Sequence, residues 1–153
     1  MSFDRLISKI ISMKNPTVAG LDPKLDYVPS YIRKSFLEED GETLKAASKA
    51  IFRYNQMIID ALCDIVPAVK LQAAYYEMYG VAGMKAYEET LKYAAEKGLV
   101  VIADAKRNDI GSTASCYAKA FLGETQVNDE AIQAFPSDYV TVNGYLFVVL
   151  YGC

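Results

Sequence analysis

The chain contains 153 residues, of which 16 are Lys or Arg and 19 are Asp or Glu, so its formal charge is −3. Hydrophobic residues make up 52% and charged residues 23%, a balance typical of one soluble domain with a packed core. A mildly acidic chain with no basic block is a poor match for a nucleic-acid backbone. No run approaches the roughly 20 apolar residues of a membrane span, and residues 1–6 lack the order of a secretory signal. We therefore expect neither nucleic acid nor membrane as a partner.

Histidine is absent, which excludes His-based catalytic triads and His metal ligands. The three cysteines, Cys63, Cys116 and Cys153, are far apart and form no Cys-x-x-Cys pair. This spacing is typical of reduced thiols in a cytoplasmic protein, and it indicates neither a disulfide framework nor a metal site. The chemistry must therefore depend on Lys, Asp, Glu, Tyr, Ser or Thr.

The hydrophobic pattern predicts helices that alternate with strands. Helical spacing covers residues 3–14, 42–63, 81–97 and 112–122, with a polar loop near 38–41 and Gly98 at a C-terminal cap position. Short apolar runs at 17–23, 65–71, 99–103 and 139–142 predict four strands. Strands that are joined through long helices pair in parallel, so we expect an α/β fold.

Ionisable residues follow three of the four predicted strands, at Asp22, at Lys70 and over residues 104–109. In parallel α/β proteins, ligands bind at the carboxyl ends of the strands. Asp104 and Lys106 are two residues apart, so their side chains should project to the same side. Lys70 could approach Asp104 if the two strands pair, whereas Asp109 lies beyond the predicted strand and need not share that side.

Each of these features also has a purely structural interpretation. The charged string 104–109 could be a solvated cluster, and Lys70 could extend its amine to water. The aromatic group around Tyr75, Tyr76 and Tyr79 is more typical of core and rim than of a ligand cage. The functional interpretation depends on the coincidence of these groups at one edge of the sheet.

Three segments resemble the orotidine 5′-phosphate decarboxylase family, most closely its longer bacterial subgroup. They are V-A-G-L-D-P at 18–23, V-K-L-Q at 69–72 and I-A-D-A-K-R-N-D-I-G-S-T at 102–113. The resemblance implies a TIM (β/α)8 barrel, a homodimer, and conversion of orotidine 5′-phosphate (OMP) to UMP and carbon dioxide. It also implies that neither a metal nor an organic cofactor takes part.

The resemblance assigns roles residue by residue. Asp104 would lie against the departing carboxylate, and Lys106 would protonate the pyrimidine carbon that is left behind. Lys70 would bridge Asp104 and the ribose, and Asp22 would bind a ribose hydroxyl. Asp109, together with Ile110 and Thr113, would reach into the site of the partner subunit.

A complete barrel of this type takes about 250 residues, so we expect this chain to hold only about the first four β/α units. Residues 1–146 would form the amino-terminal half of the barrel, followed by an atypical apolar tail at 147–153. The other half would carry the grip on the substrate phosphate. Because remote binding of that kind stabilises the transition state, we expect the chain alone to be nearly inactive.

Three other functions fit parts of the pattern. The first is a magnesium-dependent sugar-phosphate decarboxylase or aldolase, which shares the D-x-K-x-x-D string. The second is a Schiff-base aldolase with Lys70 or Lys106 as the nucleophile. The third is a half-barrel with no catalytic function.

Overall fold

A computed structural model of the chain describes residues 2–147. The elements in chain order are α1 Ser2–Met13, β1 Val18–Leu21, the 3-10 turn η1 Leu25–Tyr27, α2 Ser30–Asp40, α3 Leu44–Leu62, β2 Ala68–Gln72, α4 Ala74–Glu77, α5 Gly80–Glu96, β3 Val100–Asp109, α6 Gly111–Phe121, β4 Thr125–Val127, β5 Glu130–Ile132 and β6 Tyr139–Phe147. Of the sequence-predicted tail, residues 148–153 lie outside the described residues. No helix among residues 2–147 combines the length and the apolar character that crossing a bilayer requires.

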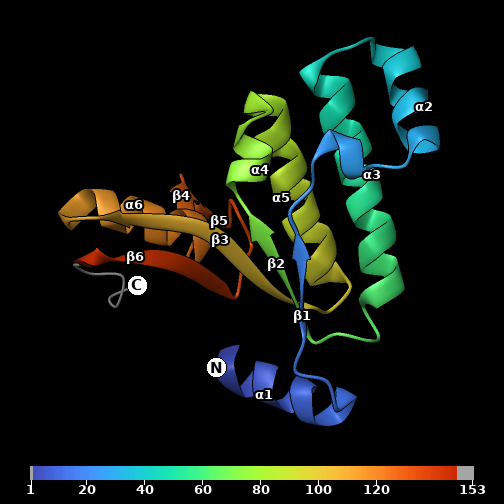
Figure 1. The fold of residues 1–153 in the computed structure, drawn as a ribbon. Coiled ribbons are helices and arrows are strands. Elements are labelled where there is room, and N and C mark those ends of the chain that lie inside the picture. Colours follow the sequence, from blue (N-terminus) through green and yellow to red (C-terminus); the bar gives the residue numbers. More distant parts are fainter. Residues whose placement is uncertain (1, 148–153) are drawn as a thin grey trace.

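The four longer strands form one parallel sheet in the order β1-β2-β3-β6, which confirms the α/β prediction. Figure 1 shows α3 and α5 side by side on one face of this sheet, with α6 running along β3 and β6. This repeated strand–helix order is that of successive units of a β/α barrel. The described chain accounts for about half of such a barrel.

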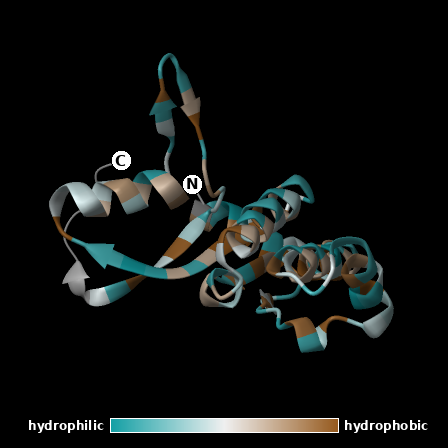
Figure 2. Cartoon of the chain, turned by 90° about the horizontal axis from the view of Figure 1, so that it is seen from above, coloured by the Kyte–Doolittle hydropathy of each residue, from teal (hydrophilic) through white to brown (hydrophobic). Residues whose placement is uncertain are grey.

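The core fills the space between the sheet and the helices. Val69 and Leu71 of β2 and Val101 of β3 are almost fully buried, and they belong to the same cluster as Ile51 of α3 and Leu91 of α5. Seen from above, hydrophobic residues gather where the sheet meets the helices, and the outer helix faces are mainly hydrophilic (Figure 2). Burial of this apolar surface is the main force that holds the helices on the sheet.

Helix α1 crosses beneath the amino ends of the strands (Figure 1) and is held there by Arg5. The Arg5 guanidinium donates to the carbonyls of Gly98 and Leu99, at 3.1 and 2.9 Å, and pairs with Asp138 at 2.6 Å. Asp138 in turn accepts from the backbone N–H of Val101 at 2.9 Å. These contacts fix the end of the sheet that lies opposite the charged strand ends.

The structure adds elements that the hydrophobic pattern did not predict. Helix α2 buries only Ile32, so its sequence carries a weak amphipathic signal. The short helix α4 and the hairpin β4–β5 were not predicted either, and every residue of the two hairpin strands is exposed. With little apolar surface to bury, such segments leave no periodic pattern.

The predicted end of β3 was wrong. The predicted strand covered residues 99–103, with 104–109 on or just past its end, whereas β3 continues through them to Asp109. The cause is pairing with β6, in which Arg107 lies opposite Val142 and Asp109 opposite Phe147, with shifts of register between these pairs. A polar segment becomes a strand here because a partner from far along the chain satisfies its backbone.

Candidate active site

The alternation of side chains along β2 and β3 brings the predicted charged residues together. Val69 and Leu71 face the helices, so Lys70 and Gln72 lie on the opposite face of the sheet. Strands β2 and β3 pair in parallel with Gln72 opposite Asp104, which places Asp104 beside Lys70. The prediction that Lys70 approaches Asp104 is confirmed.

Four charged groups form a continuous chain of alternating sign on this face. The amine of Lys106 lies 2.6 Å from Oδ1 of Asp104, and the amine of Lys70 lies 3.1 Å from Oδ2 of the same carboxylate. Lys70 also donates to both carboxylate oxygens of Asp22, at 3.0 and 3.1 Å. The order is therefore Lys106, Asp104, Lys70, Asp22. It confirms that Asp104 and Lys106 project to the same side.

Asp104 is the centre of this arrangement, with only 7% of its surface exposed. Its Oδ1 accepts from Lys106 and, at 2.7 Å, from the hydroxyl of Thr141, while its Oδ2 accepts from Lys70 and, at 3.1 Å, from the amide of Gln72. A buried carboxylate requires partners of this kind. Four donors hold Asp104 ionised and fix its orientation.

Sequence reasoning missed the parts played by Gln72 and Thr141. For Gln72 a signal was present, because it lies two residues after Lys70 and so shares its face in a strand. Thr141 belongs to the predicted strand 139–142, but its contact with Asp104 depends on the register of β6 against β3. A single sequence carries no signal for that register.

Lys106 occupies an unusual backbone position. Its φ angle is 50°, in the left-handed region that residues with a Cβ seldom adopt, and its N–H donates to the Thr141 hydroxyl at 3.1 Å. The register of β3 against β6 shifts over the same segment. The side chain is 60% exposed, so its amine points to the open side of the sheet while it contacts Asp104.

Hydrogen bonds and ion pairs shift the pKa values of buried Asp104 and half-buried Lys70. Burial opposes the negative charge of Asp104, but hydrogen bonds from Lys106, Thr141 and Lys70 outweigh it and lower the pKa of this carboxyl. Burial also opposes the positive charge of Lys70, yet its hydrogen bonds to Asp22 and Asp104 raise the pKa of its amine. Both residues are therefore charged at neutral pH.

The end of β1 and the residues that support it position Asp22. The buried hydroxyl of Tyr76 donates to the carbonyl of Leu21 at 3.1 Å and accepts from the amide of Asn55 at 3.0 Å. A cavity of about 210 Å³ lies next to Asp22, between β1, η1 and α3. Tyr76 and Tyr79 are both buried, as expected for core residues rather than a ligand cage.

The structure does not bring the other three predicted residues into this cluster. Asp109 ends β3, and its Oδ1 accepts from the backbone N–H of Ile110 at 2.8 Å. Ile110 and Thr113 are exposed at the start of α6. Within residues 2–147, no ion pair joins Asp109 to Lys70 or Lys106.

Comparison with known proteins places the chain in a family. The family model described as "Orotidine 5′-phosphate decarboxylase / HUMPS family" matches residues 43–149. The orotidine 5′-phosphate decarboxylase of Caldicellulosiruptor saccharolyticus is 41% identical over 143 residues, which are 94% of this chain and 47% of that protein. The enzyme of the same name from Clostridium acetobutylicum is 41% identical over 147 residues, or 95% of this chain and 45% of that one.

Comparison with solved structures points to the same family. A crystal structure from Streptomyces avermitilis, described as an orotidine 5′-phosphate decarboxylase, superposes with a TM-score of 0.68 at 29% identity and covers 93% of this chain and 43% of that one. A Toxoplasma gondii structure of similar description gives a TM-score of 0.69 at 29% identity, covering 94% and 40%. The chain spans about half the length of the curated relatives it matches. On its sequence and its fold, the chain belongs to the orotidine 5′-phosphate decarboxylase / HUMPS family.

Proposed function

We propose that the protein is an orotidine 5′-phosphate decarboxylase, which converts OMP to UMP and carbon dioxide in pyrimidine biosynthesis. The observation that carries the proposal is the alternating chain Lys106–Asp104–Lys70–Asp22 at the carboxyl ends of the parallel strands. Its residues are those that the family resemblance assigned to catalysis and to ribose binding. Its place is the one where β/α barrels carry out their chemistry.

The proposed reaction breaks the bond between the pyrimidine ring and its carboxylate. The bonding electrons stay on the ring carbon, because no conjugated group can accept them. The ammonium of Lys106, held beside Asp104, stabilises this negative charge by electrostatics and then donates a proton to the same carbon. No metal or organic cofactor is needed for these steps.

The carboxylate of Asp104 would face the substrate's own carboxylate. Two like charges at short range repel, and the repulsion disappears as neutral carbon dioxide leaves. Asp104 can take this role because its donors hold it ionised and buried. Lys70 would bridge Asp104 and the ribose, and Asp22 would accept from a ribose hydroxyl.

A Schiff-base aldolase is disfavoured by the same contacts. A nucleophilic amine must be neutral, whereas the two flanking carboxylates raise the pKa of Lys70. For the magnesium-dependent sugar-phosphate enzymes, no observation at this site gives specific support. Sensitivity to a chelator distinguishes that activity from the proposed one.

The direct test is formation of UMP from OMP, followed by loss of OMP absorbance and by chromatography. The chain is assayed alone and together with the carboxyl-terminal part of the Caldicellulosiruptor saccharolyticus relative that it does not match. UMP formation that is unaffected by EDTA supports the proposal. If the two parts purify as a complex and still form no UMP, the proposed function is wrong.

We further propose that the protein acts as a homodimer in which Asp109, Ile110 and Thr113 contribute to the partner's site. Support comes from Ile110, a large apolar side chain that is 59% exposed at the start of α6, next to Asp109. Sedimentation of Ile110→Asp should show a shift to monomer. The matched control is Ile132→Asp in the hairpin, where the side chain is 52% exposed. A monomeric unmodified chain would contradict the dimer.

A cytoplasmic location is also proposed. Cys63 and Cys116 are free thiols, as expected in a reducing compartment. Cell fractionation tests it, and the protein should follow soluble cytoplasmic enzymes.

A further inference from the structure

A cavity that offers both charged and apolar contacts lies away from the charged strand ends. It has a volume of about 330 Å³ and opens between α2, α3 and α5. None of Asp22, Lys70, Asp104 or Lys106 lines it. The volume falls at the lower end of the range of roughly 300–1,000 Å³ that is typical of small-molecule pockets.

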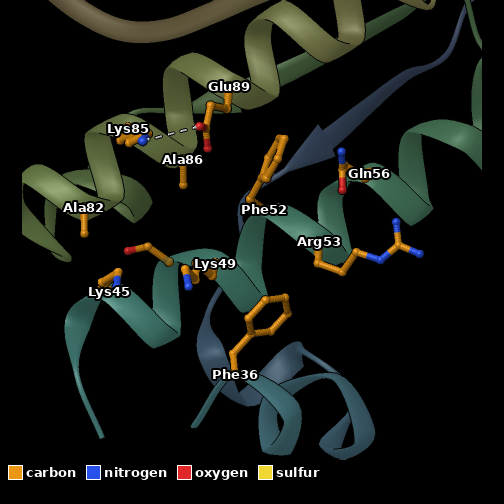
Figure 3. A pocket seen from close by; sticks show the side chains of 11 residues that line it. Phe36, Lys45, Lys49, Phe52, Arg53, Gln56, Ala82, Lys85, Ala86 and Glu89 are labelled. Carbon is orange, nitrogen blue, oxygen red and sulfur yellow. Dashed lines mark ion pairs between the residues drawn. The ribbon is translucent and has the colours of Figure 1, made fainter. Parts of the chain in front are cut away.

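The apolar part of this pocket consists mainly of two phenyl rings. Phe36 comes from α2 and Phe52 from α3, and Ala82 and Ala86 of α5 line the opposite wall. Figure 3 shows the two rings between Lys45 and Lys49 on one side and Arg53 on the other. Both phenylalanines are partly buried and pack against the core, so their rings are held in place. A flat apolar group would find a fixed surface there.

The charged part of the pocket is predominantly basic, although the whole chain is acidic. Lys45, Lys49 and Arg53 follow one another at intervals of four residues and so share one face of α3. Lys85 joins them from α5, and the pocket contains one acidic residue, Glu89. The lining therefore carries four positive charges and one negative charge.

Three of these four cations form ion pairs within 4.0 Å, whereas Arg53 interacts with Asp60 only through its charge, at longer range. Lys45 and Lys49 pair with Asp40, Lys49 also pairs with Glu39 at 3.1 Å, and Lys85 lies 3.9 Å from Glu89. Arg53 is exposed and forms no ion pair with any residue in the range 2–147. A guanidinium in this position offers a planar set of donors that matches phosphate or carboxylate oxygens.

We propose that this pocket binds a small phosphate monoester that carries a flat ring, with the ring against Phe36 and Phe52 and the phosphate on Arg53. A phosphate monoester is favoured over a carboxylate because it carries between one and two negative charges at neutral pH. Glu39, Asp40 and Glu89 offset the charges of Lys45, Lys49 and Lys85, so the positive charge that the phosphate would meet first is that of Arg53. The site is separate from the candidate active site and does not depend on the proposed decarboxylation.

The test uses phenyl phosphate as the probe, titrated into the isotope-labelled chain while backbone amide signals are followed by NMR. We expect saturable shifts concentrated at residues of α3 and α5 that line the pocket, with a dissociation constant below about 1 mM. Inorganic phosphate and phenol, which each supply half of the probe, should bind at least tenfold more weakly. Shifts that centre on Lys70 and Lys106 instead would place the probe in the candidate active site and overturn the proposal.

Two variants locate the binding. Arg53→Gln removes the guanidinium that forms no ion pair. Because this side chain is exposed, the variant should fold as the unmodified chain does, and its affinity for phenyl phosphate should fall at least fivefold. Phe52→Leu should weaken binding similarly, with a melting curve to confirm that it is folded. Lys92→Gln, on α5 outside the pocket, is the matched control and should bind as the unmodified chain does. Unchanged affinity in Arg53→Gln, or no saturation by phenyl phosphate, would refute the site.

Discussion

Thr141 of β6 donates a hydrogen bond to Asp104 of β3, with its hydroxyl oxygen 2.7 Å from Oδ1 of the carboxylate. The same hydroxyl accepts from the backbone N–H of Lys106 at 3.1 Å. One side chain thus fixes both the orientation of Asp104 and the left-handed backbone of Lys106. Because it acts through these two residues, Thr141 is a positioning residue.

Replacing Thr141 by valine should raise the pKa of Asp104, because the carboxylate loses a donor that stabilises its charged form. Thr141→Ser keeps the hydroxyl and is the matched control, so it should leave this pKa close to that of the unmodified chain. Titration of the Asp104 carboxyl carbon by NMR measures both. Equal pKa values in the valine and serine variants would show that the bond does not act on Asp104.

The free energy of unfolding should decrease at both acidic and alkaline pH. The pKa of Asp104 is lowered by folding, so its stabilisation is present above about pH 4 and is lost as the pH falls through the folded-state value. The pKa of Lys70 is raised, so its stabilisation is present below about pH 10.4 and is lost as the pH rises through the folded-state value. Urea unfolding across this range should show a plateau between two declines.

Lys70→Met tests whether the charged residues cause this dependence of stability on pH. It removes the amine between Asp22 and Asp104, so the unfolding free energy at pH 7 should fall by about 1–3 kcal/mol. The decline at high pH should shrink as well. Lys92→Met removes an amine paired on the outer surface of α5 and should change stability by under about 1 kcal/mol. If both variants lose the same small amount of unfolding free energy, the row of charged side chains Lys106–Asp104–Lys70–Asp22 does not stabilise the fold.

Tyr76→Phe tests the buried support beneath Asp22. The change leaves the Leu21 carbonyl without its donor and removes a partner of Asn55, so we expect a loss of about 1–3 kcal/mol in unfolding free energy. Tyr31→Phe, at a side chain that is 66% exposed, is the control and should be neutral. A neutral Tyr76→Phe would mean that this hydrogen-bond network is not needed to hold the end of β1.

Arg5→Ala tests the attachment of α1. The variant loses contacts to Gly98, Leu99 and Asp138, so the amides of α1 should exchange hydrogen faster and stability should fall by about 1 kcal/mol. Lys9→Ala on the same helix is the control. Unchanged exchange in α1 would show that apolar packing alone holds the helix.

The parts of the structure that the sequence predicted are those with strong local patterns. Apolar runs indicated the four parallel strands, and period-two alternation placed Asp104 and Lys106 on one side. The true length of β3 and the role of Thr141 depend on pairing with β6, a contact between segments more than 30 residues apart. Such register is decided by tertiary packing, which leaves no periodic signal in one sequence.

The roles of Asp109, Ile110 and Thr113 remain predictions for a different reason. These roles depend on a partner subunit. Within residues 2–147, the hydrogen bond that the Asp109 carboxylate accepts comes from the backbone N–H of its neighbour Ile110. Family resemblance supplied these roles, and the folded chain by itself does not assemble them.

The role of Lys106 is tested most directly by comparing the rate of UMP formation from OMP in Lys106→Ala with that in Lys92→Ala, in the preparation that forms UMP. Loss of Lys106 should lower the rate by at least about 1,000-fold, because the variant lacks both the charge that stabilises the carbanion and the proton that quenches it. Lys92→Ala should retain the full rate. Equal rates in the two variants would contradict the assignment of Lys106 beside Asp104 as the proton donor.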